Sequence, residues 1–269
     1  MDKSVDNFNV RLRTIRIRDL IIGLIITSVI CGILMVIFPS IYDSDELFMI
    51  VFIVIMELFF VYCLLGTKGL KNDFKNLFED SINKDIIYVL ILNLQFAFLF
   101  VFLISLADLL IGFSDPTWIS MWDIDSVDID SGILILDSIA SIFLAPVIEE
   151  LIFRGVLFNR LKIRTGIIPA MIISSLLFAV GHDFGGITSA FIFGICMCIL
   201  YLKTDNILVP MSIHFLNNVS AEVINLFGID IFLAQFPWLI PSLIITIIGT
   251  VYLIRYILKE SKIVKKEFG

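Results

Sequence analysis

Long uninterrupted apolar runs constrain the fold of this 269-residue chain more than any other feature of its sequence. A helix needs about 20 apolar residues to cross the hydrocarbon core of a bilayer. Eight runs approach or exceed that length, and they occupy residues 20–38, 47–66, 86–112, 132–158, 167–183, 186–202, 206–227 and 236–257. The sequence therefore predicts an all-α, polytopic membrane protein with eight transmembrane helices.

The composition supports the same class. Hydrophobic residues make up 59% of the chain and charged residues 17%, with a mean hydropathy of +1.03. Soluble domains average about 45–50% apolar and about 25% charged residues. The net charge of -7 is divided between the two sides of the membrane, so it does not indicate a nucleic-acid partner, and none is expected.

The basic residues are distributed unevenly along the chain. All 19 Lys and Arg residues lie in the two terminal segments or in or beside the alternate connections near 67–85, 154–164 and 203. The other connections, such as 43–46 and 113–131, carry acidic residues only. Because Lys and Arg accumulate on the cytoplasmic side, this pattern predicts that both termini are cytoplasmic and that the number of spans is even.

Three charged residues interrupt the fourth apolar run. Glu149 and Glu150 are adjacent, and Arg154 follows four residues after Glu150. A charge near the bilayer centre costs at least ~2.5–3.5 kcal/mol on insertion scales, so such residues indicate a function or a partner. The i,i+4 spacing predicts that Glu150 and Arg154 share a helix face and pair. Glu149 points about 100° away, at an expected depth of about 14 Å.

The chain has two histidines, and both lie in apolar runs. His214 should lie about 12 Å and Asn218, one turn later, about 18 Å from the cytoplasmic side, close to the depth of Glu149. Counted from residue 167, His182 comes out about 23 Å deep, unless its span is tilted or starts deeper. The "DFGG" segment that follows could then be a loop buried against protein.

Two prolines precede these polar residues. Pro146 lies three residues before Glu149, and Pro210 lies four residues before His214. A proline inside a helix frees a backbone carbonyl and bends the helix, so we expect two kinks beside a hydrated cavity.

Two interpretations of the polar residues are open at this point. They can be buried pairs that lock helices together. Alternatively, carboxylate, imidazole and amide groups at similar depth can hydrolyse a bond, since they supply a base for water and donors for an oxyanion. The grouping of these residues favours hydrolysis.

Three short motifs carry a resemblance to a known family. They are "EELIFR" at 149–154, "FAVGH" at 178–182 and "HFLNN" at 214–218. In this order they resemble the CPBP intramembrane protease family, which includes CAAX prenyl proteases and bacteriocin-processing or immunity proteins. The resemblance covers about residues 140–220.

The resemblance implies catalytic roles for six residues. Glu149 with His182 would position and deprotonate the attacking water. His214 and Asn218 would form the oxyanion hole, and Glu150 with Arg154 would hold the base in place. Glu149, His182 and His214 could also hold one zinc ion with an open fourth position. No carboxylate partner is evident for either histidine, which favours a site without a tightly bound metal.

The resemblance also implies an organisation and partners. Residues 1–131 would form an N-terminal membrane region with three spans and an acidic external loop. Residues 132–228 would form a catalytic four-helix core, and residues 229–269 the last span and a basic cytoplasmic tail. The expected activity is that of an intramembrane endopeptidase of a prokaryotic plasma membrane, which cleaves a membrane-associated protein or peptide. The alternative is a non-catalytic scaffold or immunity protein that binds a membrane partner.

Overall fold

The computed structural model describes residues 7–77, 80–115, 117, 131–182 and 185–268. Over these residues the chain is helical and contains no β-strand. Five helices are long and apolar enough to cross a bilayer: α2 (Ile17–Ile37), α4 (Asp45–Cys63), α6 and α7 taken together over Lys84–Ser114, α12 (Ile187–Thr204) and α15 (Leu239–Phe268). An all-α polytopic membrane protein is therefore confirmed, whereas most of the predicted acidic loop 113–131 lies outside the described residues.

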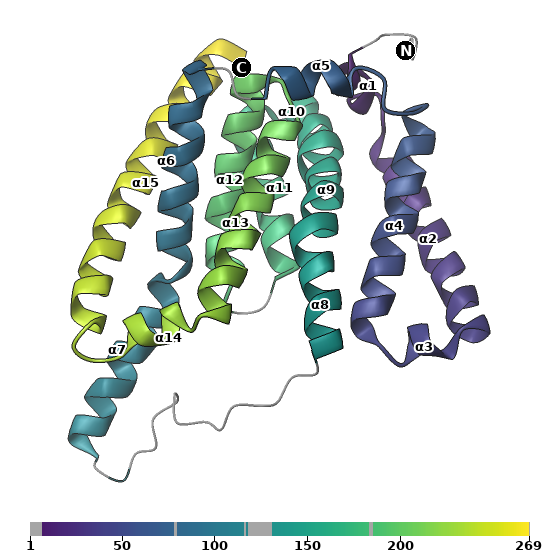
Figure 1. The fold of residues 1–269 in the computed structure, drawn as a ribbon. Helices are drawn as coiled ribbons and strands as arrows, with labels where there is room; N and C mark the ends of the chain where they lie inside the picture. Colours follow the sequence, from purple (N-terminus) through teal and green to yellow (C-terminus); the bar gives the residue numbers. More distant parts are fainter. Residues whose placement is uncertain (1–6, 78–79, 116, 118–130, 183–184, 269) are drawn as a thin grey trace.

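The number of eight spans is not confirmed. The predicted span 132–158 is a continuous rod (Figure 1) made of α8 (Ser131–Ile139), the π-helix η1 (Ala140–Leu144), α9 (Ala145–Glu150) and the π-helix η2 (Leu151–Phe158), and it continues into α10 (Asn159–Thr165). The predicted span 167–183 is only the 14-residue α11 (Ile167–Val180), about 21 Å long. The first of these is divided into short α- and π-helices, the second is too short, and α13 (Leu208–Leu226) is more polar, so none of the three counts among the five candidate spans.

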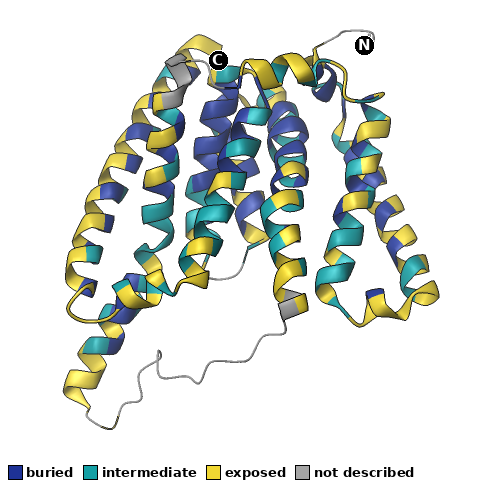
Figure 2. Ribbon diagram, viewed as in Figure 1, coloured by how far each residue is buried: buried dark blue, intermediate teal, exposed yellow. Residues whose placement is uncertain are grey.

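The centre of the bundle is α12, which has the largest buried share among the five long helices (Figure 2). It packs against α6 (Asp80–Ala97), α11, α13 and α15. Gly194 allows a close approach of α12 to α11, because a Cβ there would lie 2.9 Å from the Cβ of Ser175. Small residues at such crossings allow membrane helices to pack backbone to backbone.

A helical hairpin of α2, α3 (Pro39–Tyr42) and α4 stands at one side of the bundle (Figure 1). Its helices meet where the ring of Phe59 covers Gly23. Large apolar side chains on its outer surface, such as Ile25 and Val29, are exposed (Figure 2), as expected of helices that face lipid.

The short helices α1 (Phe8–Leu12) and α5 (Leu70–Lys75) lie at the same end of the bundle as α10 and the C-terminal end of α15, whereas α3 and α14 (Ile229–Ala234) lie at the other end (Figure 1). This arrangement agrees with both termini being on one side of the membrane. The cytoplasmic identity of that side stays a prediction.

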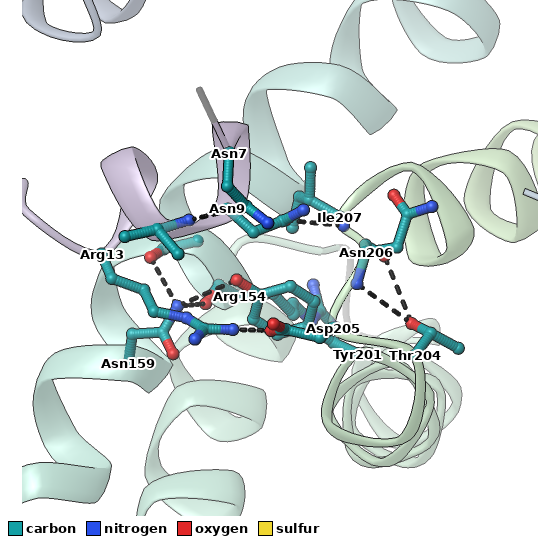
Figure 3. A network of polar contacts seen from close by, with 12 residues as sticks. Asn7, Asn9, Arg13, Arg154, Asn159, Tyr201, Thr204, Asp205, Asn206 and Ile207 are labelled. Carbon is teal, nitrogen blue, oxygen red and sulfur yellow. Dashed lines mark hydrogen bonds and ion pairs between the residues drawn. The ribbon is translucent and has the colours of Figure 1, made fainter. Parts of the chain in front are cut away.

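Polar contacts hold this end together (Figure 3). Asn9 on α1 donates to the Asp73 carboxylate at 2.9 Å and accepts from the backbone N–H of Ile207 at 3.0 Å. Arg13 pairs with Asp205 in the same connection between α12 and α13. The N-terminal segment thereby fixes the position at which α13 begins.

Candidate active site

Glu150 is fully buried at the end of α9 and receives two partners on one oxygen. Its Oε1 accepts from Nη1 of Arg154 at 3.0 Å and lies 3.0 Å from Nδ1 of His214. The predicted pairing of Glu150 with Arg154 is thus present, and both side chains have no exposed surface. A buried charge of this kind persists only when it is paired, so Glu150 joins η2 to α13.

His214 lies between the two adjacent glutamates. While its Nδ1 faces Glu150, its Nε2 lies 3.7 Å from Oε2 of Glu149. The Glu149 side chain is 30% exposed, so it can be reached from outside, unlike Glu150. Because the hydrogen bond to Glu150 orients the ring, the other nitrogen is presented to Glu149 and to the neighbouring cavity.

His182 follows the C-terminal end of α11 and is half-buried. Its Nδ1 lies 3.1 Å from the backbone O of Phe178. The helix of the predicted run 167–183 ends at Val180, and Gly181 forms its cap. Residues 183–184 of the "DFGG" segment lie outside the described residues. The short helix brings His182 beside the same cavity as His214, so the calculated difference in depth does not separate them.

Phe178 is the aromatic centre of the site. The guanidinium carbon of Arg154 lies 4.4 Å from its ring centroid, and the rings of His182 and His214 lie 4.7 and 5.8 Å away. The sequence presented this residue only as the first letter of the "FAVGH" motif. In the structure it supports the cation and both imidazoles, and cation–π contact stabilises the desolvated Arg154.

Asn218 lies one turn beyond His214, as the spacing predicts, and its Nδ2 donates to the backbone O of Ser141 at 2.8 Å. In η1 the backbone bonds join residues five apart, as from Ala145 N to Ala140 O. The next such bond would reach Ser141 from residue 146, but Pro146 has no N–H. Asn218 therefore satisfies the carbonyl that the proline leaves free, and it ties α13 to the helix that carries Glu149.

The two prolines differ in their effect. Pro146 lies where η1 passes into α9, in agreement with a disturbed helix. The kink expected at Pro210 is wrong, because α13 begins at Leu208 and the proline lies in its first turn. The N–H groups of a first turn have no partner within the helix, so a proline there removes no bond.

A cavity of about 130 Å³ lies beside these residues, and its wall includes His182, His214 and Asn218. Asn93 of α6 also lines it, although α6 contributes none of the motif residues. Asn93 is 4% exposed; its Nδ2 donates to Val89 O, and its Oδ1 has no hydrogen-bond partner among the described residues. An asparagine inside the apolar run 86–112 was the signal in the sequence that could have pointed to it.

Glu149, His182 and His214 are the residues that a zinc ion would need. The expectation that neither histidine has a carboxylate partner is wrong for His214, whose Nδ1 meets Glu150. Contacts of this type, or to a carbonyl as at His182, orient metal-binding imidazoles. However, no three His, Cys, Asp or Glu side chains of the described residues are close enough together to hold an ion. Glu149, His182 and His214 therefore do not fit as a ligand set in this arrangement.

Comparison with known families gives one matching model. Residues 131–220 match the family described as Type II CAAX prenyl endopeptidase Rce1-like. The matched stretch runs from α8 into α13 and contains all three motifs.

Two curated bacterial proteins are similar to part of the chain. The "Putative membrane peptidase YdiL" of Bacillus subtilis (strain 168) is 31% identical over 98 residues, which cover 36% of this chain and 40% of YdiL. The "Membrane-embedded CAAX protease MroQ" of Staphylococcus aureus (strain USA300) is 39% identical over 82 residues, which cover 28% of this chain and 33% of MroQ. The chain thus aligns with less than half of either relative. No solved structure matches it.

Proposed function

We propose that this chain, an integral membrane protein whose residues 131–220 match the Rce1-like family, is an intramembrane endopeptidase of the CPBP type that uses Glu149 as its base. The family and the names of the two relatives support a membrane protease. The observation that carries the finer proposal is the position of His214, with one ring nitrogen 3.0 Å from Glu150 and the other 3.7 Å from Glu149. Such an arrangement orients an imidazole toward a reacting group, which a ring that served only as packing would not need.

In the proposed reaction a water molecule beside the partly exposed Glu149 carboxylate attacks the carbonyl carbon of the scissile peptide bond. Glu149 accepts the proton of that water as the new C–O bond forms. When the tetrahedral intermediate collapses, the C–N bond breaks and the proton passes from Glu149 to the leaving amine. His182, which lines the cavity, is proposed to position the attacking water together with Glu149.

The negative oxygen of the intermediate needs hydrogen-bond donors. His214 and Asn218 line the same cavity from one face of α13, so both can serve. One N–H of the Asn218 amide is engaged by Ser141, and the second remains for the oxyanion. A donor that is held in place before the reaction costs no reorganisation when the charge develops.

The substrate is proposed to be a membrane-associated protein or peptide. In the alternative, the same helices form a non-catalytic scaffold that binds a membrane partner. The names of the relatives do not favour it.

The test is a proteomic comparison of membrane-derived peptides from cells that express wild-type or Glu149→Gln protein. Glu57→Gln is the matched control, because Glu57 is a half-buried intramembrane glutamate on α4. We expect product peptides with wild type and with Glu57→Gln, and their loss with Glu149→Gln. Identical peptides in all three samples would contradict the proposal. If cells that lack the protein differ from wild type in growth or behaviour and the Glu149→Gln protein restores them, the scaffold is favoured.

A further inference from the structure

A second and larger cavity lies away from the catalytic residues, where α2 begins. Its volume is about 650 Å³, and its wall is formed by the start of α2, the C-terminal part of α4 and Arg160 of α10. An adjacent cavity of about 570 Å³ shares Arg16, Arg18 and Arg160 with it and adds Arg164. Four arginines from two separate segments therefore surround one hollow surface.

The positive charge of this surface is poorly compensated. Asp19 is its single carboxylate; it pairs with Arg18 at 3.6 Å and accepts from the backbone N–H of Arg16. Among the described residues, no carboxylate lies within ion-pair distance of Arg16, Arg160 or Arg164.

Arg160 is held in place by the backbone. Its Nε donates to Ile15 O at 2.7 Å and its Nη2 to Arg13 O at 2.6 Å. Burial lowers the pKa of Arg160, and the neighbouring Arg16 and Arg164 lower it further against the opposite effect of Asp19. The guanidinium groups thus repel one another, and a bound anion would relieve that repulsion.

The other wall of the cavity is apolar and open. Ile22 of α2 and Phe59 and Tyr62 of α4 line it, and Tyr62 and Leu65 are 76% and 64% exposed. Both helices are long enough to span a bilayer, so this wall continues into surface that faces lipid. The cavity therefore combines cations at one end with hydrocarbon contact at the other.

A further cavity provides a contrast within the same molecule. It is lined by Lys84, Arg255 and Lys259, and by Asp85 and Glu260, so its charges are nearly balanced. Basic residues at this end of the bundle are thus not by themselves unusual. What distinguishes the cavity at α2 is the excess of arginine beside an exposed apolar wall.

We propose that the cavity at the start of α2 binds the phosphate of an anionic glycerophospholipid headgroup, with an acyl chain against Ile22 and Phe59. Guanidinium groups bind phosphate oxygens through charge-assisted, often bidentate hydrogen bonds. Basic pockets between helices at the cytoplasmic leaflet suit such headgroups, since that leaflet is rich in anionic lipid. A free phosphate offers the same oxygens but leaves the apolar wall uncovered. The site does not depend on the proposed protease activity.

The test measures lipid binding to the purified 269-residue chain by native mass spectrometry. The probes are dioleoylphosphatidylglycerol and zwitterionic dioleoylphosphatidylcholine. Arg16→Gln/Arg164→Gln removes two exposed guanidiniums from the cavity, and Lys265→Gln/Lys266→Gln removes two exposed charges from α15 as the control. We expect the first variant to bind phosphatidylglycerol about tenfold more weakly. The control should bind it like wild type, and phosphatidylcholine should bind equally weakly to all three.

Melting temperatures without added lipid should agree among the three proteins, because all four substituted residues are exposed. If the double variant has a lower melting temperature than wild type, the two single variants replace it, and each should lose less affinity for phosphatidylglycerol. Equal phosphatidylglycerol binding by wild type and cavity variants overturns the proposal, and so does an equal loss in the control. Displacement of the lipid by millimolar inorganic phosphate would overturn the lipid assignment in favour of a soluble anion.

Discussion

Glu149 and Glu150 are neighbours in the chain but have different surroundings, so substitutions of the two residues should have different effects on activity and stability. Glu150 is fully buried against Arg154 and His214, whereas Glu149 is partly exposed beside His214. The first arrangement is that of a structural ion pair, and the second suits the group that we propose to activate water.

Glu149→Gln should lower kcat by about 10²–10⁴, because the amide keeps the size of the side chain but cannot accept the proton of water. The melting temperature should stay that of wild type. Turnover of a peptide found in the proteomic comparison measures the first quantity, and a thermal scan measures the second. Near-normal turnover by the purified variant, with Glu57→Gln as the control, would remove Glu149 from the mechanism.

Glu150→Gln should lose thermal stability as well as activity. It leaves the Arg154 charge buried without its carboxylate, and breaking a buried pair in this way costs about 3–5 kcal/mol. Thermal unfolding in detergent tests this expectation, with Glu267→Gln at an exposed position of α15 as the control. A variant that is fully stable yet inactive would instead indicate direct catalysis by Glu150.

At the scale of helices, two contacts decide where the site residues lie. One is the hydrogen bond from Asn218 on α13 to the Ser141 carbonyl that Pro146 leaves free. The other is the close approach of α11 and α12 at Gly194. Each can be changed without touching Glu149.

A double-mutant cycle separates the structural role of Asn218 from its proposed catalytic role. Asn218→Ala should lower stability and also cost about 2.7–4 kcal/mol in activation free energy, by analogy with other oxyanion donors. Pro146→Ala restores an N–H that can bond the Ser141 carbonyl. In that background Asn218→Ala should cost less stability, measured by thermal unfolding, while its cost in kcat should persist. If the cost in kcat disappears too, Asn218 acts only by positioning the helix.

Gly194→Ala should destabilise the bundle by about 1–3 kcal/mol, as expected for overpacking. The new Cβ would lie 2.9 Å from the Ser175 Cβ and 3.1 Å from its Cα. The helix backbone at Ser175 cannot easily move away to relieve this contact. Gly32→Ala on α2 is the control, since nothing lies within 4 Å of its Cβ and alanine favours the helix by about 0.8–1.0 kcal/mol. The midpoints of chemical denaturation of the two variants should shift in opposite directions. Equal shifts would contradict the close packing of α11 against α12 at Gly194.

At the scale of the whole molecule, the site draws on more of the chain than the family match covers. Asn93 on α6 lines the cavity, and α6 also packs against α12, α13 and α15. The N-terminal α1 contacts the other side of η2, where Leu12 covers Gly155. The division at 131 and 228 stays a prediction, and residues from both sides of 131 line the cavity.

The membrane orientation is tested by cysteine labelling. In a protein without its native cysteines, Asp43→Cys should react from the external side and Lys71→Cys from the cytoplasmic side. The reason is that all 19 basic residues lie in or beside segments assigned to one side. Both positions are exposed, so a membrane-impermeant maleimide can reach them in intact cells or in inverted vesicles. Labelling of both from the same side would contradict the topology.

By itself, the sequence determined the class of the protein and the grouping of its basic residues, and it singled out the polar residues of the candidate site. These follow from local hydropathy and from spacings within one helix, such as the i,i+4 pair of Glu150 and Arg154. The number of spans was not determined in the same way. Hydropathy does not distinguish a helix that crosses the bilayer from a short one such as α11.

Only the tertiary structure decided which groups meet. It placed His214 rather than His182 against Glu150 and Glu149, turned Asn218 to Ser141, and brought Asn93 into the cavity. These contacts depend on the rotation and register of helices far apart in the chain. A shift of one residue turns a helical side chain by about 100°, and span boundaries read from hydropathy are uncertain by more than that.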